Sequence, residues 1–447
     1  MKKSLIGILG LSAMALVACG EGGEGGTTGT NARIRIWGPT EERAVVEAVI
    51  GAYNDANPND KITYDFTAIT EADAGTTVAA DPTVEGYPAL FACADDHLSN
   101  LATIRGIVTP LPNIYAEDVI EATAETAVTA GSIDGQLYAY PISVDNGYFL
   151  YYDARVYDET DVATFEGLLE KSAEANKQVI MDVENGYYSA AFFMAQGVCG
   201  PESLSYEYQT NKSGTQQVAV YDCDWDSDAA AEMIYESSKL FTTYGSKEVT
   251  PAATMVGAED KDINTGLGNG TLGAFVSGTW LNANAVTAWG DNVRAVKLPT
   301  LQGHQLGSFA GTKLYCVNGY ATPQEQATAH KVAQILTSKE AQLTRYELRS
   351  SIPCNLEAQA DEDYIADVAT NPTLAALQEQ SKYAAVQATS AEATYWTVGE
   401  AIGGVILRGT YTENEVETDL NKGGVAAWKK YLEAQVALLT DPAALDA

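Results

Sequence analysis

The chain has 447 residues, of which 46 % are hydrophobic, and its formal net charge is −34. The hydrophobic content argues against a disordered chain, and the length predicts two domains or lobes. The negative charge argues against nucleic acid and anionic membrane surfaces as partners, because both would repel the protein. The 25 tyrosines against 9 phenylalanines favour a ligand with apolar faces and polar edges.

The beginning of the chain predicts export and lipidation. Two lysines precede an apolar run that ends at Val17, which is typical of a secretory signal and is too short to span a bilayer comfortably. The sequence LVAC, ending at Cys19, resembles a bacterial lipobox, so we expect 1–18 to be a lipoprotein signal peptide and Cys19 to carry the lipid. Residues 19–32 predict a flexible tether. The protein is thus expected outside the cytoplasm as a membrane-anchored lipoprotein; an ordinary signal peptide that contains a cysteine is the alternative.

Strands and helices alternate along the body. Strand patterns occur at 33–37, 61–66, 87–93, between the Asp134-Gly135 turn and Ile142, at 148–152 and before Trp280, and helical patterns occur at 41–54, 185–196, 229–240 and in ATYWTVGEAIGGVILRGT. This alternation favours parallel sheets covered by helices. Ligands of such sheets bind beyond the carboxyl ends of the strands, and this rule selects Trp37 through Glu42 and Asp95 through His97.

The cysteines and one acidic run could form disulfides or a metal site. Five cysteines follow Cys19, and an odd number leaves at least one free thiol, so the pairing of the others stays open; they are Cys93, Cys199, Cys223, Cys316 and Cys354. The alternating acids of YDCDWDSD resemble the start of a calcium loop, but Ser227 and Met233 occupy the positions of its glycine and glutamate. We expect Asp226 or Ser227 to cap a helix instead. No metal and no other cofactor is expected.

Several motifs occur together in the order of a known family. They are RIWGPTEE, AYNDANPNDKITYDF, ADDH, GQLYAYPISVDNGYFLYYD, NGTLGAFVSGTW with VKLPTLQG, and TYWTVGEAI. Through them the chain resembles the family 1 extracellular solute-binding proteins of ABC importers, especially the maltose/maltodextrin-binding group. The resemblance implies an α/β, two-lobe periplasmic-binding-protein-like fold with a multi-segment hinge and a ligand cleft between the lobes. It places the N-terminal lobe at 33–143 plus 312–366 and the C-terminal lobe at 144–311 plus 367–447.

The resemblance also implies a set of sugar-binding residues. Asp96, His97 and Asp145 match polar positions that bind sugar hydroxyls, and Tyr187, Trp280 and Trp396 match aromatic residues that stack on sugar rings. His97 and Glu400 depart from basic residues that members carry there. The full set of expected ligand-binding residues is Glu41, Glu42, Asp95, Asp96, His97, Asp145, Tyr187, Trp280, Tyr395, Trp396 and Glu400. Five of them have a structural alternative, namely a core position for Tyr187, Trp280 and Trp396 and a helix cap or turn for Asp96 and Asp145.

The physical chemistry of sugars agrees with this set. Aromatic rings cover the C–H faces of a sugar, and carboxylates accept pairs of its hydroxyls. We therefore expect a lipid-anchored, monomeric receptor, not an enzyme, that captures an oligosaccharide, with maltose or a maltodextrin as the leading ligand, and delivers it to ABC permease subunits. The alternatives are a binding protein for another oligosaccharide or a polyol and, from another class, a secreted glycoside hydrolase, which also uses carboxylates and aromatic residues.

Overall fold

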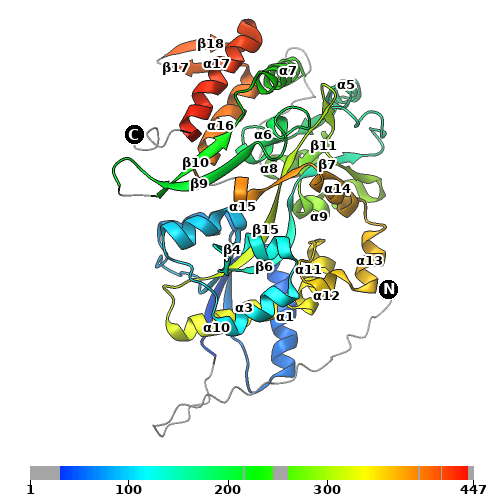
Figure 1. Ribbon diagram of the computed structural model, residues 1–447. Coiled ribbons are helices and arrows are strands. Elements are labelled where there is room, and N and C mark those ends of the chain that lie inside the picture. The colour runs from blue at the N-terminus through cyan, green and yellow to red at the C-terminus, as the bar shows by residue number, and fades with distance from the viewer. Residues whose placement is uncertain (1–30, 215–216, 245–259, 391–392, 414, 441–447) are drawn as a thin grey trace. The chain divides into compact units, whose positions relative to one another are not determined.

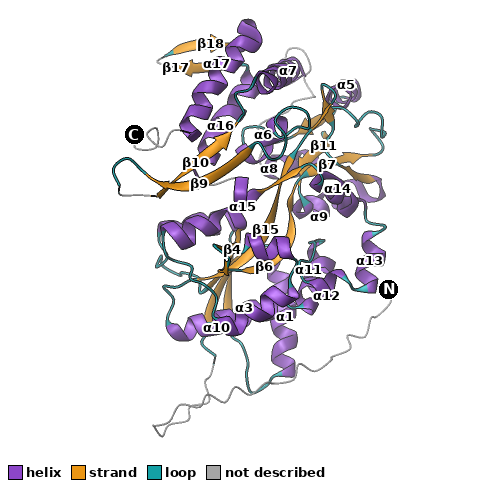
Figure 2. Ribbon diagram, in the orientation of Figure 1, coloured by secondary structure: helices purple, strands orange, loops and turns teal. Residues whose placement is uncertain are grey.

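The computed structural model describes residues 31–214, 217–244, 260–390, 393–413 and 415–440. The expected signal peptide, Cys19 and most of the tether lie outside these residues. Asn31–Ala447 forms one compact unit, and helices and strands alternate around two larger sheets (Figures 1 and 2). Among the described residues, no helix combines the length and the apolar character that crossing a membrane would need.

The first sheet has six strands. They are β2 (Tyr64–Ala68), β1 (Ile34–Gly38), β3 (Leu90–Ala94), β15 (Ser308–Val317) and β16 (Ala384–Val386) in spatial order, with β6 (Tyr140–Gly147) also paired to β15. Strand β1 runs parallel to β2 and β3, whereas β15 runs antiparallel to β3 and β6. The turns that follow β1 and β3 therefore lie at the same edge of the sheet.

Both faces of this sheet are buried. Successive side chains of a strand point to opposite faces, so Leu90 and Ala92 enter one core while Phe91 and Cys93 enter another. Helices α1 (Glu42–Ala56), α3 (Asn113–Ala122) and α10 (Pro323–Leu336) contribute to the first core, and α2 (Glu71–Ala80) contributes to the second. This double burial explains why YPALFAC is apolar without alternation.

The second sheet has four strands. They are β12 (Val293–Val296), β7 (Phe149–Asp153), β11 (Leu272–Ser277) and β8 (Gln178–Ile180) in spatial order. Strand β7 is antiparallel to both β11 and β12, and only β8 and β11 are parallel. Both sheets are thus mixed, and the expectation of parallel sheets is correct only in part. The reason is that β7 and β15 follow strands or loops outside their own sheet, so no crossover helix fixes their direction.

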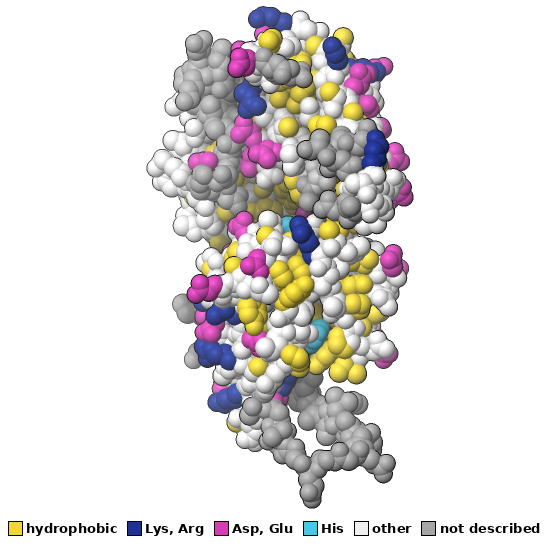
Figure 3. Space-filling view, turned by 90° about the vertical axis from the view of Figure 1, so that its left-hand side faces the viewer, with side chains coloured by type: hydrophobic (Ala, Val, Ile, Leu, Met, Phe, Trp, Pro, Cys, Tyr) yellow, Lys and Arg dark blue, Asp and Glu magenta, His cyan; other side chains and the backbone are white. Residues whose placement is uncertain are grey.

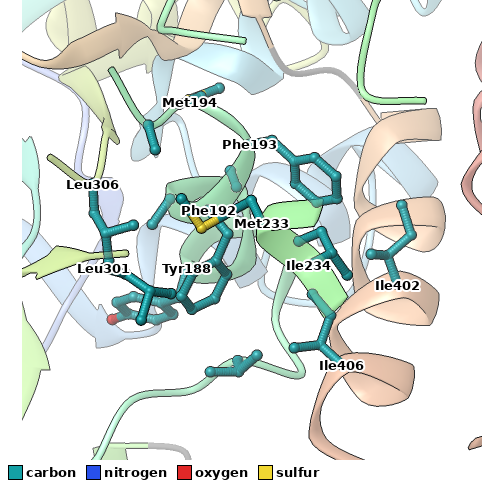
Figure 4. Packing of buried hydrophobic residues seen from close by; sticks show 14 of the residues in the cluster. Tyr188, Phe192, Phe193, Met194, Met233, Ile234, Leu301, Leu306, Ile402 and Ile406 are labelled. Atoms are coloured by element: carbon teal, nitrogen blue, oxygen red, sulfur yellow. The ribbon is translucent and has the colours of Figure 1, made fainter. Parts of the chain in front are cut away.

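We call the parts built around the first and the second sheet the first and the second half. The larger core of the second half lies between helices and one face of its sheet. Helix α6 (Gly186–Phe193) contributes Tyr188, Phe192 and Phe193, which pack with side chains of α7 (Asp228–Tyr244) and α16 (Ala393–Arg408) (Figure 4). Helices α6 and α16 approach each other closely at two glycines. A Cβ added to Gly186 would lie only 3.1 Å from the Cα of Gly399. The contact places α16, which carries Tyr395 and Trp396, against α6.

The remaining elements complete the two halves. The helices are α4 (Glu125–Ala130), α5 (Phe165–Ala175), α8 (Asp260–Asn269), α9 (Asn282–Trp289), α11 (Lys339–Arg349), α12 (Leu356–Gln359), α13 (Glu362–Val368), α14 (Pro372–Ser381), α15 (Gln387–Ser390) and α17 (Leu420–Thr440). Short helical turns are η1 (Asp95–His97), η2 (Asn100–Ile104), η3 (Thr279–Leu281) and η4 (Gly290–Asn292). The hairpins are β4 (Ser132–Ile133) with β5 (Gln136–Leu137), β9 (Leu204–Thr210) with β10 (Gln217–Cys223), β13 (Thr300–Leu301) with β14 (His304–Gln305), and β17 (Thr410–Glu413) with β18 (Val416–Asp419).

Strand β15 joins the two halves. Its first part pairs with β16 and places Phe309 in the core of the second half, while its last part places Tyr315 and Val317 in the core of the first. Strand β6 pairs with β15 and leads into β7 through Tyr148. The middle of β15 is therefore the place where elements of both halves meet (Figure 1).

Candidate functional site

Two adjacent aspartates occupy the turn that follows β3. Asp95 and Asp96 are only 2 % and 6 % exposed. Oδ2 of Asp95 accepts a hydrogen bond of 2.8 Å from the backbone N–H of Thr312, and Oδ2 of Asp96 accepts one of 3.1 Å from Nε1 of Trp396. The Oδ1 atom of each has no partner among the described residues. Burial, with the adjacent charge of Asp96, raises the pKa of Asp95 well above its usual range.

Aromatic side chains lie beside this acidic turn. Tyr187 stacks on Phe309 with ring centroids 5.9 Å apart, and the Trp396 ring lies 6.5 Å from Tyr187 and 5.8 Å from Phe309. The Tyr187 hydroxyl donates to the carbonyl oxygen of Asn146 over 3.0 Å. Tyr187 and Trp396 are partly exposed, so both could present a ring face to a ligand. Phe309 is fully buried and packs against both rings, and the sequence did not single it out because a phenylalanine inside an apolar strand has no distinguishing pattern.

Asp145 is completely buried near the end of β6. Its carboxylate accepts hydrogen bonds from the hydroxyls of Ser143 (2.6 Å) and Thr279 (3.0 Å). Burial alone would raise the pKa of Asp145, but the charge of Lys313 and the hydrogen bond from Ser143 hold it below its usual value. Asp145 therefore stays ionised, and the hydroxyls of Ser143 and Thr279 bind its carboxylate.

Trp280 and Lys313 lie next to this carboxylate. The Trp280 ring packs tightly on Gly278, where an added Cβ would come within 1.9 Å of the ring. Nζ of Lys313 lies 5.4 Å from the centroid of the Trp280 ring, within the range of a cation–π contact. The sequence analysis missed Lys313, although a lysine within the apolar run KLYCV of a central strand was a signal that could have found it.

Gly311 connects the acidic turn to the Asp145 region. A Cβ at this position would lie 2.8 Å from Oε1 of Gln387, 3.0 Å from Nδ2 of Asn146 and 3.1 Å from Oδ1 of Asp95. Polar groups from η1, β6 and α15 therefore converge on the backbone of β15. Nδ2 of Asn146 also donates to Gln387 over 2.8 Å. The space-filling view shows a hollow floored by hydrophobic side chains between the upper and lower parts of one face (Figure 3).

Several expected site residues have other surroundings. Glu42 is buried against Arg345, Arg349 and the Tyr315 hydroxyl. Burial would raise its pKa, but the two guanidinium groups bring the pKa down to about 2. Glu41 is exposed and pairs with Arg349 at 3.3 Å. These glutamates follow β1 as expected, yet the Glu42 carboxylate is directed into the packing of α1 against α11.

The other residues outside the group are Tyr395, Glu400 and His97. Tyr395 is fully buried, and its hydroxyl donates to the carbonyl of Gly186 over 2.8 Å, so it has the surroundings of a core residue. Glu400 is exposed on α16. The ring of His97 is half-buried close to Gly75, where an added Cβ would come within 2.6 Å of it. Tyr395 faces the core although its neighbour Trp396 is partly exposed, because adjacent residues of a helix face different directions.

The other sequence expectations concern cysteines and metals. The five cysteines of the body are free thiols in the structure, and the Sγ atoms of Cys93 and Cys316 lie 3.5 Å apart. In the segment that resembles a calcium loop, Oγ of Ser227 accepts from the backbone N–H of Ala230 over 3.2 Å, which confirms the cap of α7. Within the described ranges, no cluster of three histidine, cysteine or acidic side chains has the geometry to hold a metal.

Two surface hollows lie away from these residues. One, of about 420 Å³, is lined by residues such as Asp153, Lys177 and Trp289, and the other, of about 710 Å³, by residues such as Ile120, Glu125 and Leu356. Neither includes an expected site residue. We place the candidate site at β15 instead, because the unpartnered carboxylate oxygens and partly exposed rings converge there.

Comparison with known proteins identifies relatives in fold and family. A family model for bacterial extracellular solute-binding proteins matches residues 48–373. A structure solved with acarbose has 25 % identity and a TM-score of 0.71, and the match covers 91 % of this chain and 98 % of that one. The maltodextrin-binding protein of L. casei, solved without ligand, has 20 % identity and a TM-score of 0.67, and the match covers 92 % of this chain and 100 % of that one.

A further structure is the maltose/maltodextrin-binding domain from Bdellovibrio bacteriovorus bound to maltotriose. It has 18 % identity and a TM-score of 0.68, and the match covers 91 % of this chain and all of that one. These likenesses establish the two-lobe periplasmic-binding-protein fold. Among curated proteins, none matches the chain in sequence.

Proposed function

This chain belongs to the bacterial extracellular solute-binding proteins, and from that premise we propose that it captures an oligosaccharide and delivers it to an ABC permease. Maltose or a maltodextrin is the leading ligand, and another oligosaccharide or a polyol is the alternative. We propose that the protein performs no chemistry on the sugar. The structure solved with acarbose supports a sugar-like ligand, since it has 25 % identity over 91 % of this chain.

One observation carries this proposal. The Oδ1 atoms of Asp95 and Asp96 are buried and lack partners among the described residues, and they lie beside the ring system of Tyr187 and Trp396. A buried acceptor without a donor costs about 1–3 kcal/mol. A sugar supplies hydroxyl donors for such oxygens and C–H faces for the rings. An oligosaccharide therefore satisfies both features at once.

We further propose the arrangement of the lobes and the anchor. The N-terminal lobe would take 33–143 plus 312–366, and the C-terminal lobe 144–311 plus 367–447. The change of core along β15, from Phe309 to Tyr315, supports a boundary near 311. A lipid on Cys19 would hold the body near the membrane, where the permease works.

The test is a binding screen. The chain lacking residues 1–30 would be measured by calorimetry against maltose, maltotriose, other neutral oligosaccharides and polyols. Saturable binding of maltotriose is expected, and binding of none of the compounds would refute the proposal. Release of new reducing ends during incubation would instead support a glycoside hydrolase.

A further inference from the structure

Lys313 occupies the centre of the candidate site. It lies on β15 between Ala94 of β3 and Ser143 of β6, which are its partners in the sheet. Ala94 immediately precedes the acidic turn, and Ser143 donates to Asp145. The lysine is only 5 % exposed. Its position thus lies between the two groups of polar residues described above.

The ammonium group of Lys313 has few partners. Its nearest carboxylate oxygen is Oε1 of Glu71 at 3.8 Å, which is longer than a hydrogen bond, and the Trp280 ring is its other neighbour. No hydrogen bond of Nζ occurs among the described residues. An ammonium has three donors, and those of Lys313 keep solvent contact, since Nζ is not among the fully buried atoms without a partner in the described residues. A ligand that brings oxygen acceptors to this point would therefore reach these donors and accept hydrogen bonds from them.

Basic groups around Lys313 do not outnumber the carboxylates, because Glu41 also pairs with Arg349. Nη2 of Arg349 lies 3.9 Å from the same Glu71 oxygen and belongs to the network around Glu42. The basic groups of this buried network are Lys313, Arg345 and Arg349, and its carboxylates are Glu42, Glu71 and Asp145. A ligand carboxylate would add an uncompensated negative charge beside Asp145 and Glu71, whereas hydroxyl and ring oxygens would not.

We propose that Lys313 binds the ligand directly, and that its ammonium donates hydrogen bonds to the oxygens of an uncharged sugar unit lying against Trp280. This inference rests on the proposed function and adds a contact residue and a charge class to it. Trp280 supplies the apolar contact, and Lys313 supplies donors that the carboxylates of the site lack. The two side chains act together because the ammonium lies above the ring.

The experiment compares Lys313→Met, Lys313→Arg and the wild type by calorimetry with maltotriose and with trigalacturonic acid, an acidic trisaccharide. Lys331→Met is the matched control, since Lys331 is also ion-paired, with Asp60 at 2.5 Å, but lies on α10. The melting temperature of each ligand-free variant is measured in parallel. A lower melting temperature would show that Asp145 has lost its counter-ion, whereas a lower affinity in calorimetry would show the loss of a ligand contact.

We expect Lys313→Met to weaken maltotriose binding about tenfold to a hundredfold, the range for a charged hydrogen bond. Lys313→Arg should restore most of the affinity, and Lys331→Met should leave it unchanged. If wild type binds maltotriose and Lys313→Met binds it equally well or more tightly, the inference is wrong while the proposed function stands. Tighter binding of trigalacturonic acid than of maltotriose would also overturn it. If wild type binds neither maltotriose nor any other neutral sugar or polyol of the screen, the proposed function fails and the inference fails with it.

Discussion

The indole Nε1 of Trp396 donates a hydrogen bond of 3.1 Å to Oδ2 of Asp96, 300 residues earlier in the chain. Trp396 belongs to α16, which packs in the second half, and Asp96 follows β3 of the first sheet. Protein groups of the two halves therefore satisfy each other where we propose the ligand binds. A ligand can favour closure only through contacts made with both halves in the closed state.

Replacing Trp396 tests the aromatic part of the site. Trp396→Ala should weaken sugar binding by about 1–3 kcal/mol, since one aromatic contact with the ligand is lost. It should also lower the melting temperature of the ligand-free protein, because the ring lies 5.0 Å from Tyr395. Calorimetry and thermal unfolding would measure the two effects.

The matched variant for this test is Trp396→Phe. It keeps a ring but removes the donor to Asp96, so it should lose less affinity than Trp396→Ala. Should Trp396→Ala bind sugar as tightly as wild type while melting at a lower temperature, Trp396 belongs to the core alone.

Closure of the lobes is testable in solution. Contacts made by one sugar with Asp96 of the first half and Trp396 of the second would favour the closed state. Small-angle scattering should then give a smaller radius of gyration after addition of the sugar that binds in the screen. An unchanged scattering profile at saturating sugar would contradict a hinge mechanism.

Glu42 should control part of the acid stability. Its folded-state pKa of about 2 lies below the unfolded value of 4.5, so its stabilising contribution is complete above pH 4.5 and is lost as the pH falls toward 2. Glu42→Gln should lower the free energy of unfolding by about 3–5 kcal/mol at pH 7, because Arg345 and Arg349 lose their buried counter-ion. Denaturant unfolding at several pH values would measure this.

The same experiment contains its own control. The difference between wild type and Glu42→Gln should shrink as the pH falls from 4.5 to 2, and the sugar affinity of the folded variant at pH 7 should match that of wild type. A large loss of affinity with unchanged stability would place Glu42 in the ligand site.

Cys19→Ala tests the anchor. The variant should incorporate no labelled fatty acid, because the thiol that accepts the lipid is absent. In a detergent phase-partition experiment, the variant should be found in the aqueous phase and not in the detergent phase, or it should accumulate as the uncleaved precursor. Labelling of the variant equal to that of wild type would show that Cys19 is not the attachment point.

The sequence by itself predicted most elements and their order. The expected strands β1, β3, β7 and β11 and the helix α16 are all present. They were predictable because each has a local residue pattern, such as the continuous apolar run YPALFAC of a strand buried on both faces. Direction was less predictable. The mixed pairing of β7 and β15 depends on where distant strands meet, and no local pattern records that.

For the site, the sequence placed Asp96 and Trp396 in the candidate set through motif resemblance, and the hydrogen bond between them is a tertiary fact. Tertiary structure alone decided that the Glu42 carboxylate pairs with Arg345, that Tyr395 points into the core, and that Lys313 lies above Trp280. The physical reason is that burial and charge pairing are set by residues hundreds of positions apart. A residue's type shows which contacts it can make, and only the packed chain determines which partner it meets.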